Sequence, residues 1–478
     1  DLIHSLTAYR TEFVKAGEPK REPINPMREV SYTRRITDNG CIVMLMNEGR
    51  RNLQFRVGID EVGKVYLMNA ETGEKTLIKN QVKDDRTWIE MKMEPWQTDF
   101  LYIERGEKKC LASQNRAIGD GETNNTEVLQ QTINRLQAEG GGTLVIDKGK
   151  YLTGALFFPR GVNLQINKDA EIISSMEEND FKPVSTRFEG IERLWKPALL
   201  NFKDGKDVRI SGNGIVEGQG VKWKSRSFYP SGRPRLICLM GCEGGQIEGI
   251  KLRNQASWGL HVLYSRDISI KGLDIQAEHS IPSSDGIDID SSKGIVISGC
   301  RIECNDDCIS IKSGKNAEGR LLHLPSSDIH VSKCTFAYGH SGVAMGSEVS
   351  GDIYNILIDS CMAMEGNEHL IRFKSQPSRG GVIENVTFRD IKVQNASNIF
   401  DVIMRWRMVG KQEEKAPELT KMRNILIERV NGTCRSLGRI EGDPDSPIEG
   451  MTLKDCHLDS QTQLIIKNAT IKKIHCNF

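Results

Sequence analysis

The sequence lacks several features that mark common protein classes. Its 478 residues contain no apolar run near the roughly 18 residues that a membrane span needs. The formal net charge is only +1, so no strong electrostatic field favours nucleic acid or a membrane surface as a partner. No Cys-x2-Cys pair with zinc-ligand spacing occurs among the 12 cysteines. We therefore expect no metal, no cofactor, no nucleic-acid partner and no membrane span.

Aromatic residues are also scarce, at 6%, whereas glycine is abundant, with 45 residues. Many glycines together with β-branched residues, and no long helical stretches, favour an all-β protein rich in turns. A chain of 478 residues is too long for one ordinary globular core. We expect two or three compact domains, or one elongated repeat domain with an additional module.

Residues 1–112 differ from the rest and predict a β-sandwich-like N-terminal module. Turn-like segments separate short stretches with partial alternation of apolar and polar residues, which is typical of a small antiparallel sandwich. The expected strands are Cys41–Met46, Asn52–Val57, Lys64–Met68, Thr87–Met93 and Phe100–Ile103. The module shows no catalytic constellation, and we interpret it as one for packing or for presenting substrate.

A helix is predicted where the second domain, residues 113–478, begins. Apolar residues with helical spacing follow Asn and Thr candidates for the N-cap, and Gly140 comes after the end. These apolar residues are Val128, Leu129, Ile133 and Leu136. We expect this helix to cover the open end of a stack of strands, which otherwise exposes unpaired backbone groups.

The rest of this domain carries a repeat of short strands. Apolar residues recur at p, p+2, p+5 and p+7 in segments that start at 268, 295, 329, 386 and 451, with shorter matches at 356 and 425. This strand-only repeat, with a period in the twenties to thirties, predicts a parallel β-helix. Four cysteines replace aliphatic residues at p+5, so we interpret them as stacked, buried residues and not as disulfide partners. They are Cys300, Cys334, Cys361 and Cys456.

A second family of strands brings polar residues to one edge of the same coils. Four segments share apolar third and fifth positions, are offset by 22, 34 and 28 residues, and start at Asp285, Asp307, Ser341 and His369. Neighbouring strands lie roughly 4.8 Å apart, so residues at this edge of four coils would lie within about 15 Å. The candidate site residues are Asp285, Asp306, Asp307, His340, Arg372 and Lys374.

Three carboxylates on neighbouring coils favour acid–base catalysis. Crowding should raise the pKa of at least one of them and leave a proton-bearing acid beside an ionised base. Glycoside hydrolysis uses such a pair, and Arg372 and Lys374 would suit an anionic sugar. Each feature alone is more often structural, but their coincidence favours a site. Because adjacent strand residues point to opposite faces, Asp306 must lie in the turn before the strand if Asp307 also reaches the groove.

These motifs resemble those of glycoside hydrolase family 28, the polygalacturonases. The family pattern is Asn-Thr-Asp, Gly-Asp-Asp, Gly-His-Gly and Arg-Ile-Lys, in that order. The matching segments are Ser283-Ser284-Asp285, Asn305-Asp306-Asp307, Gly339-His340-Ser341 and Arg372-Phe373-Lys374. The resemblance covers about residues 115–478 and implies a right-handed parallel β-helix that acts on a pectic oligo- or polysaccharide. It also implies an exported, periplasmic or secreted protein, and the start at Asp1 without a signal peptide fits either a mature form or a trimmed chain.

The resemblance further assigns a role to each site residue. It implies that Asp306 is the general acid and that Asp285 and Asp307 hold and deprotonate the attacking water. It implies that His340 supports the acid. Arg372 and Lys374 would bind a substrate carboxylate, and the reaction would invert the anomeric centre.

Two departures and one further likeness bear on the substrate. Ser283 and Ser284 replace Asn-Thr beside Asp285, which removes an amide, and Ser341 replaces the second Gly of Gly-His-Gly. The stretch 342–351 resembles the bacterial exo-acting branch, in which an added N-terminal β module also occurs. We therefore expect release of galacturonic acid from the non-reducing end of homogalacturonan or rhamnogalacturonan fragments.

Other functions stay open on the sequence alone. An endo-polygalacturonase or a rhamnogalacturonan hydrolase would share these motifs. A β-helix pectate lyase would need a calcium site and a basic residue, and a carbohydrate-binding solenoid would have no turnover at all. The linkage cleaved and the oligomeric state are not indicated by any motif.

Overall fold

The structure is a computed structural model that describes residues 11–15, 29–37, 40–59, 61, 63–83, 86–105, 108–225, 232–407 and 413–478. The chain divides into two compact units, Asp1–Glu107 and Lys108–Phe478. The division falls after residue 107, whereas the sequence placed it after 112. The reason is that β10 (Lys109–Leu111) pairs in parallel with β12 (Gly142–Ile146) of the second unit.

The first unit contains two antiparallel sheets that enclose an apolar core. One sheet has the order β1 (Thr11–Lys15), β4 (Leu53–Ile59), β8 (Arg86–Met93) and β7 (Asn80–Lys83). The other has the order β2 (Val30–Thr37), β3 (Gly40–Asn47), β9 (Thr98–Arg105), β5 (Gly63–Met68) and β6 (Lys75–Ile78). All five strands expected from the sequence are present. Buried and partly exposed residues alternate along β3, which is why its sequence pattern predicted a strand.

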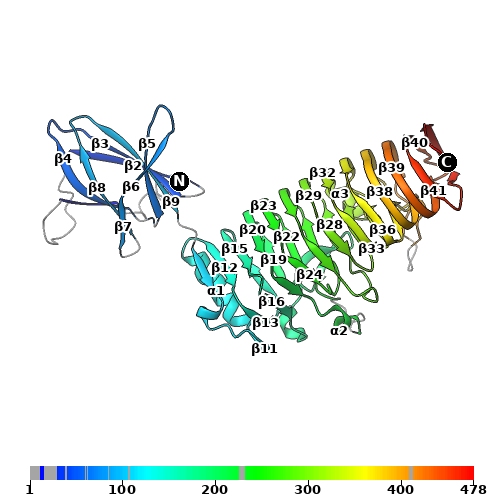
Figure 1. Cartoon of the computed structure of the whole chain (residues 1–478), viewed down its shortest axis with the longest axis horizontal. Helices are drawn as coiled ribbons and strands as arrows, with labels where there is room; N and C mark the ends of the chain where they lie inside the picture. Colours follow the sequence, from blue (N-terminus) through cyan, green and yellow to red (C-terminus); the bar gives the residue numbers. More distant parts are fainter. Residues whose placement is uncertain are drawn as a thin grey trace. The chain divides into compact units, whose positions relative to one another are not determined.

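The second unit is a right-handed parallel β-helix, in which most coils contribute one strand to each of three parallel sheets (Figure 1). The sheet that carries the site contains β14 (Leu156–Phe158), β19 (Leu200–Lys203), β22 (Ile237–Met240), β25 (Leu260–Leu263), β28 (Ile287–Asp290), β31 (Asp307–Lys312), β34 (Ser341–Met345), β37 (His369–Lys374) and β42 (Ile465–Lys467). The next sheet along the chain contains β10, β12, β15 (Val162–Ile166), β20 (Lys206–Gly212), β23 (Glu243–Glu248), β26 (Arg266–Lys271), β29 (Lys293–Ser298), β32 (Ser326–Ser332), β35 (Ile353–Asp359), β40 (Ile448–Lys454) and β43 (Ala469–Ile474).

The third sheet contains β11 (Asp120–Asn124), β13 (Gly149–Thr153), β16 (Ala170–Ser174), β21 (Ile215–Glu217), β24 (Lys251–Arg253), β27 (Asp274–Gln276), β30 (Arg301–Glu303), β33 (Thr335–Gly339), β36 (Met362–Asn367) and β41 (His457–Ser460). Two long strands, β38 (Val382–Ile403) and β39 (Lys421–Glu441), pass through all three sheets. An antiparallel hairpin of β17 (Val184–Phe188) and β18 (Ile191–Trp195) is inserted between β16 and β19.

The register of the coils follows the repeat that the sequence predicted. Ile295 lies opposite Ile329, and Ile329 lies opposite Ile356. The same row continues with Val386, Ile425 and Met451. Cys300, Cys334, Cys361 and Cys456 are free, buried thiols in the core, as expected of small stacked residues.

Few helices interrupt the strands. The helix α1 (Thr126–Ala138) contacts β12, β14 and β15 at the first coils, where Leu129, Ile133 and Leu136 enter the core of the solenoid, as the sequence predicted (Figure 1). Among the described residues, the others are α2 (Gly220–Lys224), α3 (Asn316–Leu322) and two 3-10 turns, Ser113–Asn115 and Glu178–Phe181. Within the described ranges, no helix has the length and apolarity to cross a membrane.

Candidate active site

Four neighbouring strands, β28, β31, β34 and β37, carry the predicted site. Ile287 pairs with Ile309, Ile309 with Val343, and Val343 with Ile371. These are the third positions of the four segments that the sequence aligned, so the predicted register is confirmed. The six candidate residues consequently meet at one edge of the site-bearing sheet, although more than 80 positions separate the first from the last.

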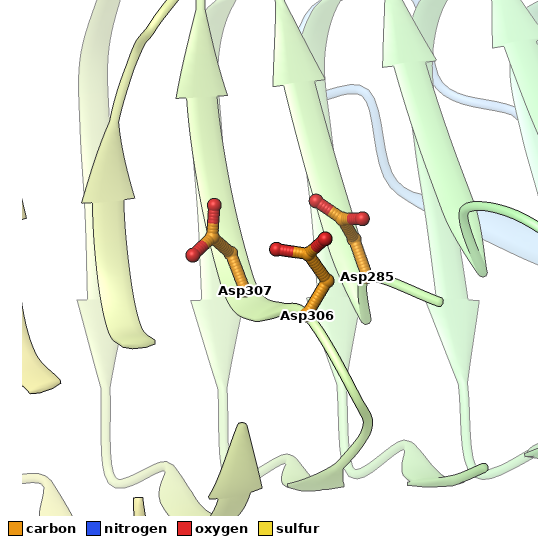
Figure 2. Close-up of side chains that lie close together, drawn as sticks. All are labelled: Asp285, Asp306 and Asp307. Atoms are coloured by element: carbon orange, nitrogen blue, oxygen red, sulfur yellow. The ribbon is translucent and has the colours of Figure 1, made fainter. Parts of the chain in front are cut away.

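Three carboxylates form the centre of the site. Asp285 lies in the loop before β28, Asp307 opens β31, and Asp306 lies in the turn between them in space (Figure 2). One oxygen of each carboxylate lies within 4.8 Å of those of the other two. Asp306 lies in the turn before the strand, as the sequence predicted. From this position Asp306 and Asp307 can both face the groove, although adjacent residues of a regular strand point to opposite faces.

Asp307 is surrounded by donors. Lys374 Nζ lies 2.7 Å from Asp307 Oδ2, Arg372 Nη1 lies 3.5 Å from Oδ1, and the Ser341 hydroxyl donates to Oδ1 at 2.6 Å. Burial alone would raise the pKa of Asp307, but the charges of Lys374 and Arg372 and the hydrogen bonds outweigh it and hold this pKa well below its usual range. Asp307 is therefore an ionised carboxylate, and the serine that departs from the family pattern contributes to keeping it so.

Asp285 has the opposite environment. Burial raises its pKa well above the usual value, and the charges of Asp288, Asp306 and Asp307 raise it further. One cation opposes them: Lys312 Nζ, 3.8 Å from Asp285 Oδ2. Burial is thus the main cause of the raised pKa of Asp285, and the crowding of carboxylates expected from the sequence adds to it.

Asp306 is the most exposed of the three carboxylates and contacts a histidine. Its side chain is 28% exposed, and its Oδ1 lies 3.3 Å from His340 Nδ1. The hydrogen bond to Asp306 raises the pKa of His340, and the charges of Asp306 and Asp307 reinforce this shift against the effect of burial. His340 therefore contacts Asp306 directly and is placed to exchange a proton with it.

Arg372 is held in place from behind by the following coils. Its Nε donates to Asp401 Oδ2 at 3.0 Å, and Arg439 Nε donates to the other oxygen, Asp401 Oδ1, at 3.0 Å. Asp401 is 2% exposed. Because a buried carboxylate fixes one edge of the guanidinium, Arg372 presents its remaining nitrogens toward Asp307 and the groove.

The serine directly before Asp285, Ser284, has structural partners. Ser284 is buried, its hydroxyl donates to Ile281 O at 2.8 Å, and it accepts a hydrogen bond from the backbone N–H of Asn305 at 3.1 Å. This hydroxyl ties the loop of Asp285 to the turn of Asp306. The replacement of threonine by serine therefore keeps the group that the local geometry uses.

No sequence motif predicted the hairpin β17–β18, which packs against the strands of the site. Phe188 stacks on Trp258 with ring centroids 4.5 Å apart, and Trp195 stacks on Phe188 at 4.4 Å. Arg187 Nη1 fixes the hairpin to Asp290 Oδ1 at 3.0 Å, with both side chains almost fully buried. The backbone N–H of Gly259, next to Trp258, donates to Asp285 O. The three stacked rings of Trp258, Phe188 and Trp195, here called the aromatic wall, therefore begin one coil before Asp285.

Chemically, the groove combines ionised and protonatable carboxyl groups within a few ångströms. Such a set can protonate a leaving oxygen and deprotonate a water molecule. The three carboxylates also have the proximity to hold a cation, so the sequence-based expectation of no metal stays a prediction.

The chain belongs to the glycosyl hydrolases family 28, whose model matches residues 179–476 and thus all six site residues. A probable polygalacturonase from Vitis vinifera is 30% identical over an aligned length of 365 residues, with coverage of 71% of this chain and 72% of that relative. The chain is therefore a glycoside hydrolase, as its motifs predicted.

Solved structures share the fold. The exopolygalacturonase from Thermotoga maritima has a TM-score of 0.68 and 24% identity, with coverage of 77% of this chain and 92% of that chain. The family 28 exopolygalacturonase from Yersinia enterocolitica has a TM-score of 0.61 and 18% identity, with coverage of 89% and 83%. At identities this low, the likeness establishes the fold alone. That fold is the all-β, right-handed parallel β-helix predicted from the sequence.

Proposed function

We propose that this glycoside hydrolase cleaves the bonds of α-linked galacturonic acid in pectic polysaccharides. The observation that carries the proposal is the carboxylate trio, in which Asp307 is held ionised beside Arg372 and Lys374 while the pKa of Asp285 is raised. Cations at the edge of a carboxylate groove favour a sugar that carries its own carboxylate. A pectic polymer lies outside the cytoplasm, so we also propose an exported enzyme.

In the proposed reaction the three aspartates have different tasks. Asp306, the most exposed and the partner of His340, gives a proton to the leaving oxygen as the glycosidic bond breaks. A water molecule forms the new bond to the anomeric carbon, and its proton passes to Asp285 or Asp307. Arg372 and Lys374 bind the carboxylate of the sugar on the leaving side.

We propose that the anomeric configuration is inverted, as the family resemblance implies. Distance alone favours the other outcome, since oxygens within 4.8 Å are closer than the roughly 6.5–9.5 Å typical of inverting pairs. Proton NMR of the first product formed decides: β-galacturonic acid from an α-linked substrate is expected, and initial α-product would contradict inversion.

The aromatic wall supports exo-action. It lies one coil, roughly 4.8 Å and so about the length of one sugar, from Asp285 on the side opposite Arg372 and Lys374. A chain threaded along the groove past Asp285 would meet the hairpin β17–β18, which the stack of Phe188 on Trp258 holds there. We therefore propose that the hairpin ends the groove and that only the sugar at the non-reducing end passes Asp285.

A product profile tests the cleavage mode. On oligogalacturonides, and in parallel on rhamnogalacturonan oligosaccharides, we expect galacturonic acid alone from the first time point. Phe188→Ala opens the wall, so dimers and trimers should appear among its first products. Leu194→Ala is the matched control, because Leu194 is 68% exposed on the same hairpin, and its profile should equal that of the parent. A ladder of oligomers from the parent protein would contradict exo-action.

The same assay separates hydrolysis from elimination. A lyase would produce an unsaturated sugar that absorbs ultraviolet light, and a chelator would abolish a calcium-dependent activity. We expect no new absorbance and full activity with a chelator present. A protein that turns over none of these substrates would support the carbohydrate-binding alternative.

A further inference from the structure

The proposed base, Asp285, faces an electrostatic difficulty. It has to be ionised to take a proton from water, yet it is 4% exposed and its neighbourhood is rich in negative charge. This difficulty exists only if the site has the proposed function. A group that makes the ionisation of Asp285 less unfavourable therefore has to be found among the neighbouring side chains.

Lys312 has the required position. It ends β31, and the core-facing Ile311 before it places its side chain on the groove side of the sheet. Its Nζ lies 3.8 Å from Asp285 Oδ2. Lys312 is 5% exposed, close to the 7% of Lys374, so it reaches the groove to the same extent as a residue proposed to contact substrate.

Asp288 competes for the same ammonium group. Asp288 Oδ1 lies 2.6 Å from Lys312 Nζ, closer than Asp285 does, and Asp288 is fully buried. The ring of Trp258 covers the ammonium with its centroid 3.6 Å away. Burial raises the pKa of Asp288 to about 7 against the effect of Lys312, so on acidification this competitor is neutralised and more of the ammonium charge is left to Asp285.

We propose that Lys312 is the counter-ion that makes the ionisation of Asp285 less unfavourable, and that Asp288 is a positioning residue that sets how much of the Lys312 charge Asp285 receives. The groups that act on this pair come from several elements: Asp307 on β31, Asp306 and the Cys304 thiol in the turn before it, and Glu348 in the loop after β34. All of these are acidic. A further titratable group, His261 on β25, lies opposite Asp288 and is kept neutral because burial lowers its pKa to about 4, so Lys312 is the cation on which the arrangement depends.

Two substitutions test the proposal because they act with opposite signs. Lys312→Met removes the positive charge, so the acidic limb of the kcat/KM–pH profile should move up by about one pH unit or more. Asp288→Asn removes the competing negative charge, so the same limb should move down by a similar amount. The double variant should fall between the two. A merely structural role would lower activity in both single variants without shifting the limbs in opposite directions.

Controls separate charge from folding. Lys312→Arg retains the charge and should restore the limb to within a few tenths of a unit of the parent. Lys293→Met is the matched surface control, since Lys293 is 69% exposed, and it should leave the profile unchanged. If Lys312→Met does not fold, Asp288→Asn alone decides by the direction of its shift. Shifts in the same direction, or none, in folded variants would overturn the inference, whereas a parent inactive at every pH would overturn the proposed function instead.

Discussion

Asp285 and Asp307 are buried to nearly the same degree, at 4% and 2% exposure, but their pKa values are shifted in opposite directions. On one side of the trio, Asp307 has Lys374, Arg372 and Ser341 as partners. On the other side, Asp285 shares Lys312 with Asp288. At nearly equal burial, the number and closeness of the cationic partners therefore separate the pKa values of these two carboxyl groups.

The largest effects are expected when each of the two aspartates is neutralised in turn. Asp307→Asn leaves Lys374 and Arg372 without their buried partner, so the free energy of unfolding should fall by about 3 kcal/mol or more. Asp285→Asn removes a carboxylate whose ionisation is unfavourable, so it should change stability by less than about 1 kcal/mol. Both variants should lose at least about 100-fold in kcat/KM.

Denaturant unfolding at neutral pH measures the two stabilities. His457→Gln serves as a control for the procedure, because His457 is exposed on β41, far from the site in sequence, and its stability should equal that of the parent. Equal losses at positions 285 and 307 would mean that the surroundings of the two carboxylates do not differ in the way described.

The pH dependence of the free energy of unfolding tests the directions in which these carboxyl pKa values are shifted. A carboxyl group with a raised pKa binds more protons in the folded state, so its contribution to stability is lost as pH rises through the folded pKa. For Asp288, this loss should extend from about pH 4, the usual value of a free aspartate, to about 7. In Asp288→Asn the free energy of unfolding should therefore fall less steeply between pH 5 and 7.

The lowered pKa of Asp307 acts with the opposite sign. Its stabilising effect is present above the pKa of an unfolded aspartate and is lost only in strong acid, as pH falls through the folded value. Asp307→Asn should thus leave the slope between pH 5 and 7 unchanged while it lowers the whole curve. An equal change of slope in both variants would contradict the assignment.

The smallest effect is expected at Ser341. Ser341→Gly restores the family residue and removes one hydrogen bond to Asp307, while Lys374 and Arg372 remain. Because one hydrogen bond contributes on the order of 1 kcal/mol, Asp307 should stay ionised at neutral pH and kcat/KM should change by less than about threefold. Steady-state kinetics at pH 7 checks this, and a loss comparable to that of Asp307→Asn would show that the hydroxyl has a direct part in the reaction.

The sequence was sufficient for most of the fold because each coil repeats one pattern. Apolar residues that alternate along a strand and recur at one coil length determine both the burial and the register, so Ile295, Ile329 and Ile356 could be aligned without a structure. The same register placed Asp285, Asp306 and Asp307 together. Even the turn position of Asp306 followed from the period of a strand.

What the sequence could not reveal depends on contacts outside the repeat. The hairpin β17–β18 lies between two regular strands and has no counterpart on other coils, so periodicity gave no hint that Phe188 would meet Trp258. Lys312 and Asp288 did carry a weak signal, since both alternate with core isoleucines and must face the groove. Their pairing across two strands, however, is a side-chain contact that alternation alone does not specify.

The arrangement of the site over four successive coils has a consequence for how such a chain can lengthen. A solenoid joins each coil only to its neighbours, so a whole coil gained before β16 or after β39 would leave every pairing within the site, and the contacts of the hairpin β17–β18 with it, intact. A coil gained between β28 and β37 would preserve the core and its hydrogen bonds but move the acids roughly 4.8 Å apart from one another or from their lysine. A duplicated coil is therefore tolerated toward either end of the β-helix, but not within the stretch from Asp285 to Lys374.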